Sequence, residues 1–106
     1  MPRINTRDAH ELISELKPFT TNGSIRAEWD GPDYVVYSYG TAIAVINPEA
    51  ETVTANTHRY SVTTSRHQST TRRGLAVLIA RDGYELRNIG EPAAFRKITG
   101  QPARDY

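Results

Sequence analysis

Cysteine is absent from this 106-residue chain, and so is any long apolar segment. Disulfides and thiolate chemistry are therefore excluded, and a metal would need His, Asp or Glu as ligands. No window approaches the roughly 18 continuous apolar residues of a membrane-spanning helix, and the first residues, MPRINTRDAHEL, contain no apolar signal core. We therefore expect a cytoplasmic protein that does not enter a membrane.

Acidic residues are missing from one long stretch of the chain. Residues 52–81 contain no Asp or Glu and five arginines, at positions 59, 66, 72, 73 and 81. This leaves eight of the thirteen Lys and Arg residues against all twelve acids, so the net charge of +1 hides a segment of +5 beside a remainder of −4. Such concentrated basic charge indicates an anionic partner.

The motifs of common catalytic and cofactor sites are missing as well. No HxxxH or HExxH pattern places two metal ligands on one helical turn, and the phosphate-loop and dinucleotide fingerprints are absent. Ser65 and His67 do not form a triad by proximity, because side chains at i and i+2 of a helix diverge. We expect no metal and no cofactor, and we assign no catalytic residue.

Length and patterning predict one α+β domain over residues 1–106, with helices on one face of an antiparallel sheet. Alternating or β-branched runs separated by short turns favour a meander of four or five strands. Trp29, on the apolar side of the first run, is expected in the core. The expected strands cover about 24–29, 34–39, 42–47, 52–57 and 84–89.

Three helices complete the predicted fold, at 6–17, about 65–81 and 91–98. The first follows an i, i+3, i+4, i+7 apolar pattern and ends before Pro18, and the last has Pro92 in its first turn. The middle segment is ambiguous. A long helix would be capped by Ser65 and Gln68. The alternative ends the helix at Gly74 and makes residues 75–80 a strand, hairpinned through Asp82-Gly83. We favour the long helix, because its apolar face is continuous.

The candidate site lies in the run YSVTTSRHQSTTRRG, residues 60–74. In the long helix Arg66, Ser69, Thr70 and Arg73 form one polar stripe opposite the leucines. Free N–H groups at the helix start suit a phosphate or carboxylate, and the arginine fork adds bidentate geometry. The alternative is a solvated basic face whose arginines pair with acids of the sheet, such as Glu28, Asp33 or Glu85.

Two further groups of residues bear on function. His67 lies beside Arg66, whose charge favours the neutral imidazole that a general base requires, although an inert surface histidine fits equally. Tyr37 and Tyr39 fall on one face of their strand and form a possible aromatic surface for stacking bases. Such tyrosines more often cover a sheet edge or pack beneath a helix.

The segments YVVYSYGTAIAVI and YSVTTSRHQSTTRRGL resemble a pattern in small uncharacterised bacteriophage proteins, in which a SYGT-type strand precedes a YSxTTSRHQ-type helix start. The resemblance covers residues 34–75 and implies a phage-encoded accessory protein in the bacterial host cytoplasm. It carries no activity. The matching positions are Ser38, Tyr39, Gly40, Thr41, Tyr60, Ser61, Thr63, Thr64, Ser65, Arg66, His67 and Gln68.

Together these observations predict a binding protein that engages an anionic partner, nucleic acid or a nucleotide, through an arginine- and hydroxyl-rich helix start. One alternative is a metal-independent ribonuclease with His67 or Tyr60 as base. Another is an inhibitor of a host protein or a homo-oligomer that uses the tyrosine-bearing sheet or an edge strand. The candidate binding residues are Tyr60, Thr63, Thr64, Ser65, Arg66, His67, Gln68, Thr70, Arg72 and Arg73.

Overall fold

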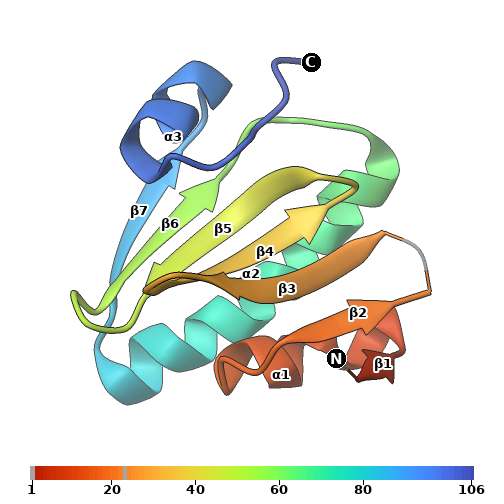
Figure 1. Cartoon of the computed structure of the whole chain (residues 1–106), viewed down its shortest axis with the longest axis vertical. Helices are drawn as coiled ribbons and strands as arrows, with labels where there is room; N and C mark the ends of the chain where they lie inside the picture. The colour runs from red at the N-terminus through yellow and green to blue at the C-terminus, as the bar shows by residue number, and fades with distance from the viewer. Residues whose placement is uncertain (1, 23) are drawn as a thin grey trace.

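The computed structural model describes residues 2–22 and 24–106. The strands of this part form one mixed sheet in chain order (Figure 1). They are β1 (Arg3–Ile4), β2 (Phe19–Thr21), β3 (Ile25–Asp30), β4 (Asp33–Ser38), β5 (Thr41–Asn47), β6 (Thr52–Asn56) and β7 (Glu85–Ile89). The helices are α1 (Ala9–Ser14), which follows a 3-10 turn (Thr6–Asp8), α2 (Val62–Asp82) and α3 (Pro92–Thr99).

The predicted antiparallel sheet of four or five strands is wrong in both number and direction. Seven strands are present in the described residues, because β1 and β2 add two short pairings beside β3. The outer pairs β1–β2 and β6–β7 are parallel. Strands of two and three residues are too short to show a period in sequence. The parallel β6–β7 pair has a different cause. The long helix α2 between these two strands returns the chain to the end of the sheet at which β6 began, so β7 runs in the same direction as β6.

The long-helix interpretation of residues 65–81 is confirmed, and the alternative hairpin is wrong. The helix begins earlier than predicted: Ser61 is the N-cap, and its Oγ accepts a hydrogen bond from the Thr64 N–H at 3.3 Å. The predicted cap at Ser65 is therefore inside the helix. Gly83 ends α2 with φ of 71°, the left-handed conformation that glycine adopts without strain. The predicted final helix is confirmed as α3, with Pro92 in its first turn.

The helices cover both faces of the sheet, which corrects the prediction that they lie on one. Figure 1 shows α1 and α2 behind the strands and α3 in front of them. Val35, Tyr37 and Val45 lie on the face of the sheet that α3 covers, where they pack with Phe95 of α3 and Ala103 of the C-terminal tail. Because both faces are covered, β4 and β5 are buried along almost their whole length, which explains their nearly continuous apolar sequence.

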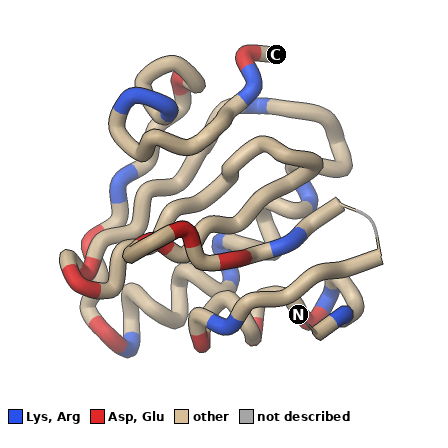
Figure 2. The backbone as a smooth tube through the Cα atoms, in the orientation of Figure 1, with Lys and Arg blue, Asp and Glu red and all other residues tan. Residues whose placement is uncertain are grey.

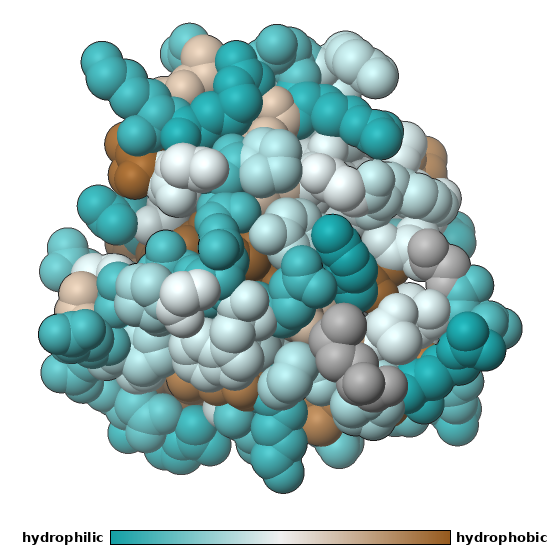
Figure 3. Space-filling model, in the orientation of Figure 1, coloured by the Kyte–Doolittle hydropathy of each residue, from teal (hydrophilic) through white to brown (hydrophobic). Residues whose placement is uncertain are grey.

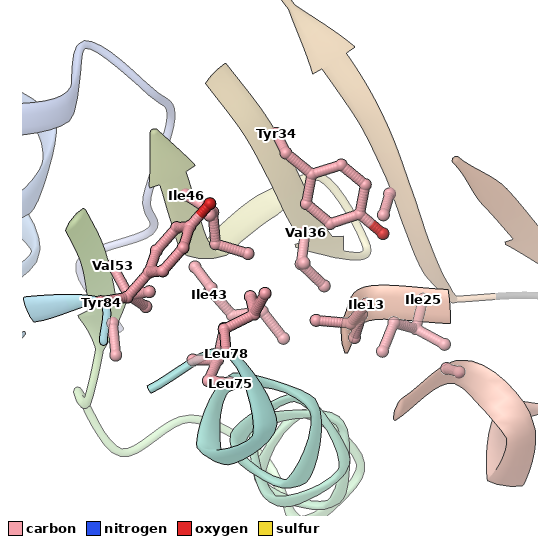
Figure 4. Packing of buried hydrophobic residues seen from close by; sticks show 14 of the residues in the cluster. Ile13, Ile25, Tyr34, Val36, Ile43, Ile46, Val53, Leu75, Leu78 and Tyr84 are labelled. Atoms are coloured by element: carbon pink, nitrogen blue, oxygen red, sulfur yellow. The ribbon is translucent and has the colours of Figure 1, made fainter. Parts of the chain in front are cut away.

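The main core lies between the sheet and the helices α1 and α2. Figure 4 shows Leu75 and Leu78 of α2 directed at the sheet residues Ile43 and Val36. The expectation that Trp29 lies in this core is wrong: it is 43% exposed near the end of β3, in edge-to-face contact with buried Tyr34 at 5.4 Å between centroids. A large ring at a strand end covers the core without entering it.

A glycine sets the distance between the two helices of this layer. A Cβ built on Gly74 of α2 would lie 2.8 Å from the backbone oxygen of His10 and 2.8 Å from the side chain of Ile13. Both contacts belong to α1, and one of them is backbone that cannot rotate away. The sequence therefore needs glycine here, in the middle of a helix where it is otherwise unfavourable.

Gly74→Ala should lower the free energy of unfolding by about 1 to 2 kcal/mol, because the overpacking cost exceeds the gain in helix propensity. Urea unfolding followed by circular dichroism measures the change. Val77→Ala, on the outer face of the same helix, should change stability by at most about 0.5 kcal/mol. A stabilised Gly74→Ala protein would show that the helices are not in close contact.

Ser61→Ala should cost about 1 kcal/mol of stability, since it removes the side-chain acceptor of the helix start. Ser65→Ala should cost less, because Ser65 lies within the helix and alanine is a better helix former. Thermal unfolding of the two variants compares the caps directly. Equal losses would contradict the assignment of Ser61 as the cap.

Candidate functional site

Helix α2 has a buried polar face and an exposed basic face in its first half. Thr64, His67, Gln68 and Thr71 are buried, and they continue along the same face into Leu75 and Leu78. Arg66 and Arg73 are exposed on the opposite side. The structure thus separates the predicted site residues into two groups that cannot contact one ligand through their side chains.

The basic face borders an open groove of about 580 Å³. The spacing of Arg66 and Arg73, seven residues or two helical turns, places them about 10 Å apart along the axis. Arg59, in the segment before α2, adds a third guanidinium, and Tyr60 adds an aromatic ring. The lining residues are Arg59, Tyr60, Val62, Ser65, Arg66, Ser69, Thr70 and Arg73. The predicted polar stripe of Arg66, Ser69, Thr70 and Arg73 is therefore present as one surface.

In the part of the chain that the structure describes, the arginines of this groove have no acidic partner. In residues 2–22 and 24–106, none of the ion pairs involves Arg59, Arg66, Arg72 or Arg73. The suggested pairing with acids of the sheet is therefore absent in these residues. Arg72 donates to Ser69 Oγ at 3.1 Å and lies outside the groove lining. Figure 2 shows several acids where the β5–β6 turn meets the far end of α2, and others on β3 and near α1.

His67 is buried among hydroxyl groups. Its Nδ1 lies 2.7 Å from Ser38 Oγ and its Nε2 lies 3.2 Å from Ser24 Oγ, and Ser38 is in turn 3.1 Å from Thr64 Oγ1. Burial lowers the pKa of His67. A neutral ring donates from one nitrogen and accepts at the other, which suits two hydroxyl partners. His67 holds the helix start to β4, and it does not face the arginines as a ribonuclease base would.

Gln68 and Tyr60 belong to a second network that fixes the segment before α2. Gln68 Nε2 donates to the backbone oxygens of Asn56 and His58, at 2.8 and 3.0 Å. Tyr60 Oη accepts from Asn56 Nδ2 and donates to the backbone oxygen of Arg104 at 2.7 Å. Burial raises the pKa of the Tyr60 hydroxyl, so it is not suited to act as a base near neutral pH. Gln68 is structural and unavailable to a ligand.

The two tyrosines of the possible aromatic surface do not share a face. Tyr37 is buried beneath the tail, where its hydroxyl donates to Gln101 Oε1 at 3.0 Å and its ring lies 4.1 Å from the guanidinium carbon of Arg26. Tyr39 is half exposed in the β4–β5 turn, with φ of 58°. Figure 3 shows small, separate apolar areas on the sheet face covered by α3. A broad stacking platform or apolar docking surface is not seen on that face.

Thr63 lies at the very start of α2, at the edge of a second hollow beside the β4–β5 turn and the tail. The sequence pattern included Thr41 without giving it a role, and it did not indicate Arg104 or Tyr106 of the same hollow. Their contribution depends on contacts between segments far apart in the chain, and no local spacing signals it. In the described residues, no cluster of His, Asp and Glu could hold a metal ion, and no helix is long and apolar enough to cross a bilayer.

Comparison with protein families gives one match. The model of a family of unknown function, DUF8033, covers residues 6–77, more than half of the chain. This chain belongs to the DUF8033 family. The match includes the groove residues from Arg59 to Arg73, and it ends before β7, α3 and the tail of this DUF8033 protein. Comparisons with curated proteins and with solved structures found no match.

Protonation of His67 should destabilise the fold. Because its pKa in the folded protein is below that of the unfolded chain, its contribution is complete above the unfolded pKa, near 6.5, and is lost as pH falls through the folded pKa. The free energy of unfolding of the wild type should therefore fall between about pH 7.5 and 5.5 more steeply than that of His67→Gln. Urea unfolding at both pH values measures this, and equal slopes would contradict it.

Proposed function

We propose that this domain binds single-stranded nucleic acid along the groove of α2, as an accessory protein of the phage type that the sequence pattern resembles. The observation that carries the proposal is the alignment of Arg59, Arg66 and Arg73 along one groove without an acidic partner in the described residues. Arginine without a carboxylate partner presents a planar fork of donors that matches phosphate oxygens.

The remaining lining supports a strand more than a compact anion. The groove is open to solvent along α2, and Ser65, Ser69 and Thr70 supply hydroxyl groups between the arginines. Arg66 and Arg73, two helical turns apart, and Arg59 before the helix suit a ligand that carries several negative charges. Tyr60 at one end offers a ring on which a base can stack.

The charge distribution of the whole molecule orients such a ligand. Arg66 and Arg73 lie in the first twelve residues of α2, whereas Glu51, Glu85 and the Arg81–Asp82 ion pair lie at its other end, about 30 Å from the helix start. A polyanion is attracted to the first region and repelled from the second. This polarity favours approach of the strand to the end of α2 that bears Tyr60.

Binding is better supported than cleavage. The groove lining contains no His, Asp or Glu, and His67 is enclosed on the opposite face of the helix. A ribonuclease needs a base within hydrogen-bond reach of the 2′-hydroxyl that attacks. The groove provides cations and hydroxyls, which position a phosphate backbone, and no group suited to take a proton at neutral pH.

A salt titration tests the proposal. Fluorescence anisotropy of a hydroxyl-ended single-stranded oligonucleotide should show affinity that falls steeply between about 50 and 200 mM salt. Arg66→Ala and Arg73→Ala should each weaken binding and lower the slope of log affinity against log salt by about 1.

Arg7→Ala is the matched control, because Arg7 is an exposed arginine with a loose 3.9 Å contact to Asp8 and lies outside the groove. It should leave affinity and slope nearly unchanged. Absence of binding by the wild type at low salt would reject the proposal. If Arg7→Ala weakened binding as much as Arg66→Ala, the binding would be general charge attraction and not binding in the groove.

A further inference from the structure

A second hollow of about 400 Å³ opens at the N-terminus of α2. Three segments far apart in sequence form it: the β4–β5 turn with Tyr39 and Thr41, the helix start with Ser61 and Thr63, and the tail with Arg104 and Tyr106. It shares Tyr60 alone with the lining of the groove. Its size is within the range of pockets that hold small organic ligands.

The helix start, which lines this hollow through Ser61 and Thr63, supplies backbone donors. The first N–H groups of a helix have no acceptor within it. Ser61 Oγ accepts the N–H of Thr64, and the Ser61 backbone oxygen accepts that of Ser65. The N–H groups of Val62 and Thr63 remain, at the positive end of a 21-residue helix. This is the arrangement in which helix starts bind phosphate.

A second observation points independently to a ligand. Thr41 is 2% exposed and lines the hollow, and its Oγ1 has no hydrogen-bond partner. In the described residues, Thr71 Oγ1 is the other buried side-chain oxygen in this state, and it faces the core from the middle of α2. A buried hydroxyl without a partner is unfavourable. A ligand oxygen that accepts a hydrogen bond from the Thr41 hydroxyl would satisfy it.

The tail that carries Arg104 is fixed through its backbone beside the helix start. The backbone oxygen of Arg104 accepts from Tyr60, and the preceding tail is fixed by the Ala42 N–H bond to Pro102 oxygen at 2.7 Å. The neighbouring acid, Asp105, is paired with Arg96 at 2.7 Å, so its charge is compensated. In the described residues no ion pair involves Arg104.

Aromatic rings flank the polar part of the hollow. Tyr39 is held in the left-handed conformation, which is uncommon for a large residue, and its side chain stays 51% exposed beside the helix start. Tyr106 is 82% exposed on the tail side. Rings at these places suit the planar base of a nucleotide whose phosphate contacts the helix start.

We infer that this hollow is a binding site for a phosphate monoester attached to a nucleoside. The phosphate accepts from the Thr63 N–H, the Thr41 hydroxyl and the Arg104 guanidinium, and the base lies against Tyr39 or Tyr106. The same chemistry occurs in a free mononucleotide and in the 5′-phosphate end of a strand. The site does not depend on the groove, because it needs neither Arg66 nor Arg73.

Calorimetric titration with AMP tests the site, with adenosine as the ligand that lacks the phosphate. AMP should bind at least about tenfold more tightly than adenosine. Thr41→Val keeps the shape of the side chain and removes the hydroxyl, and it should weaken AMP binding about tenfold. Thr71→Val, the matched change at the other unpartnered hydroxyl, should leave AMP binding unchanged.

The variants also separate binding from folding. Both valine variants replace a buried hydroxyl without a partner, so each should unfold at or above the wild-type temperature. Arg104→Ala, on the exposed tail, should weaken AMP binding about tenfold with an unchanged circular dichroism spectrum. AMP and adenosine binding equally, or Thr41→Val and Thr71→Val weakening AMP equally, would overturn the inference.

A comparison of 5′-phosphorylated and 5′-hydroxyl oligonucleotides identifies the source of the phosphate. Preference for the phosphorylated strand without AMP binding assigns the site to strand ends, and AMP binding without that preference assigns it to free nucleotides. Either result supports the inference, and absence of both AMP binding and preference for the phosphorylated strand would overturn it. If AMP binds and the hydroxyl-ended strand does not, strand binding in the groove is rejected and the nucleotide site in the second hollow is supported.

Discussion

Helix α2 is attached to the sheet by apolar packing in its second half and by hydrogen bonds in its first half. The position of both candidate binding surfaces depends on these hydrogen bonds. Its second half packs through Leu75 and Leu78. Its first half is held by hydrogen bonds from His67 to Ser38 and from Gln68 to the backbone before the helix. Directional bonds fix the rotation of a helix about its axis more narrowly than apolar contact does. That rotation turns Arg66 and Arg73 outward and brings the helix start to the β4–β5 turn.

The elements with long periodic patterns could be predicted from the sequence, and those that depend on distant contacts could not. The five longer strands, α3 and most of α2 follow from alternation, helical spacing and Pro92. The short strands β1 and β2 exist because β3 offers an edge to pair with. The parallel β6–β7 pair was implied by the long helix, since such a crossover returns the chain to the same end of the sheet.

The site was predictable to the extent that it lies on one helix. The stripe of Arg66, Ser69, Thr70 and Arg73 follows from spacing alone, and so does the burial of Gln68 and Thr71 with the leucines. The same spacing also places His67 and Thr64 on that buried face. Their burial was not predicted, because polar side chains are usually exposed. Thr41 and Arg104 reach the helix start through the turn and the tail. No pattern within a short window contains that information.

The crossover through α2 also affects how the chain emerges during synthesis. β6 forms its antiparallel pair with β5 as soon as both are made, but its other edge waits for β7, which follows the whole of α2. For that interval β6 presents unpaired N–H and C=O groups on the ribosome-bound chain. Such an exposed strand edge can pair with strands of other chains and aggregate. Thr52, Thr54 and Asn56 make this strand half polar, which limits such association until the helix has brought the last strand into place.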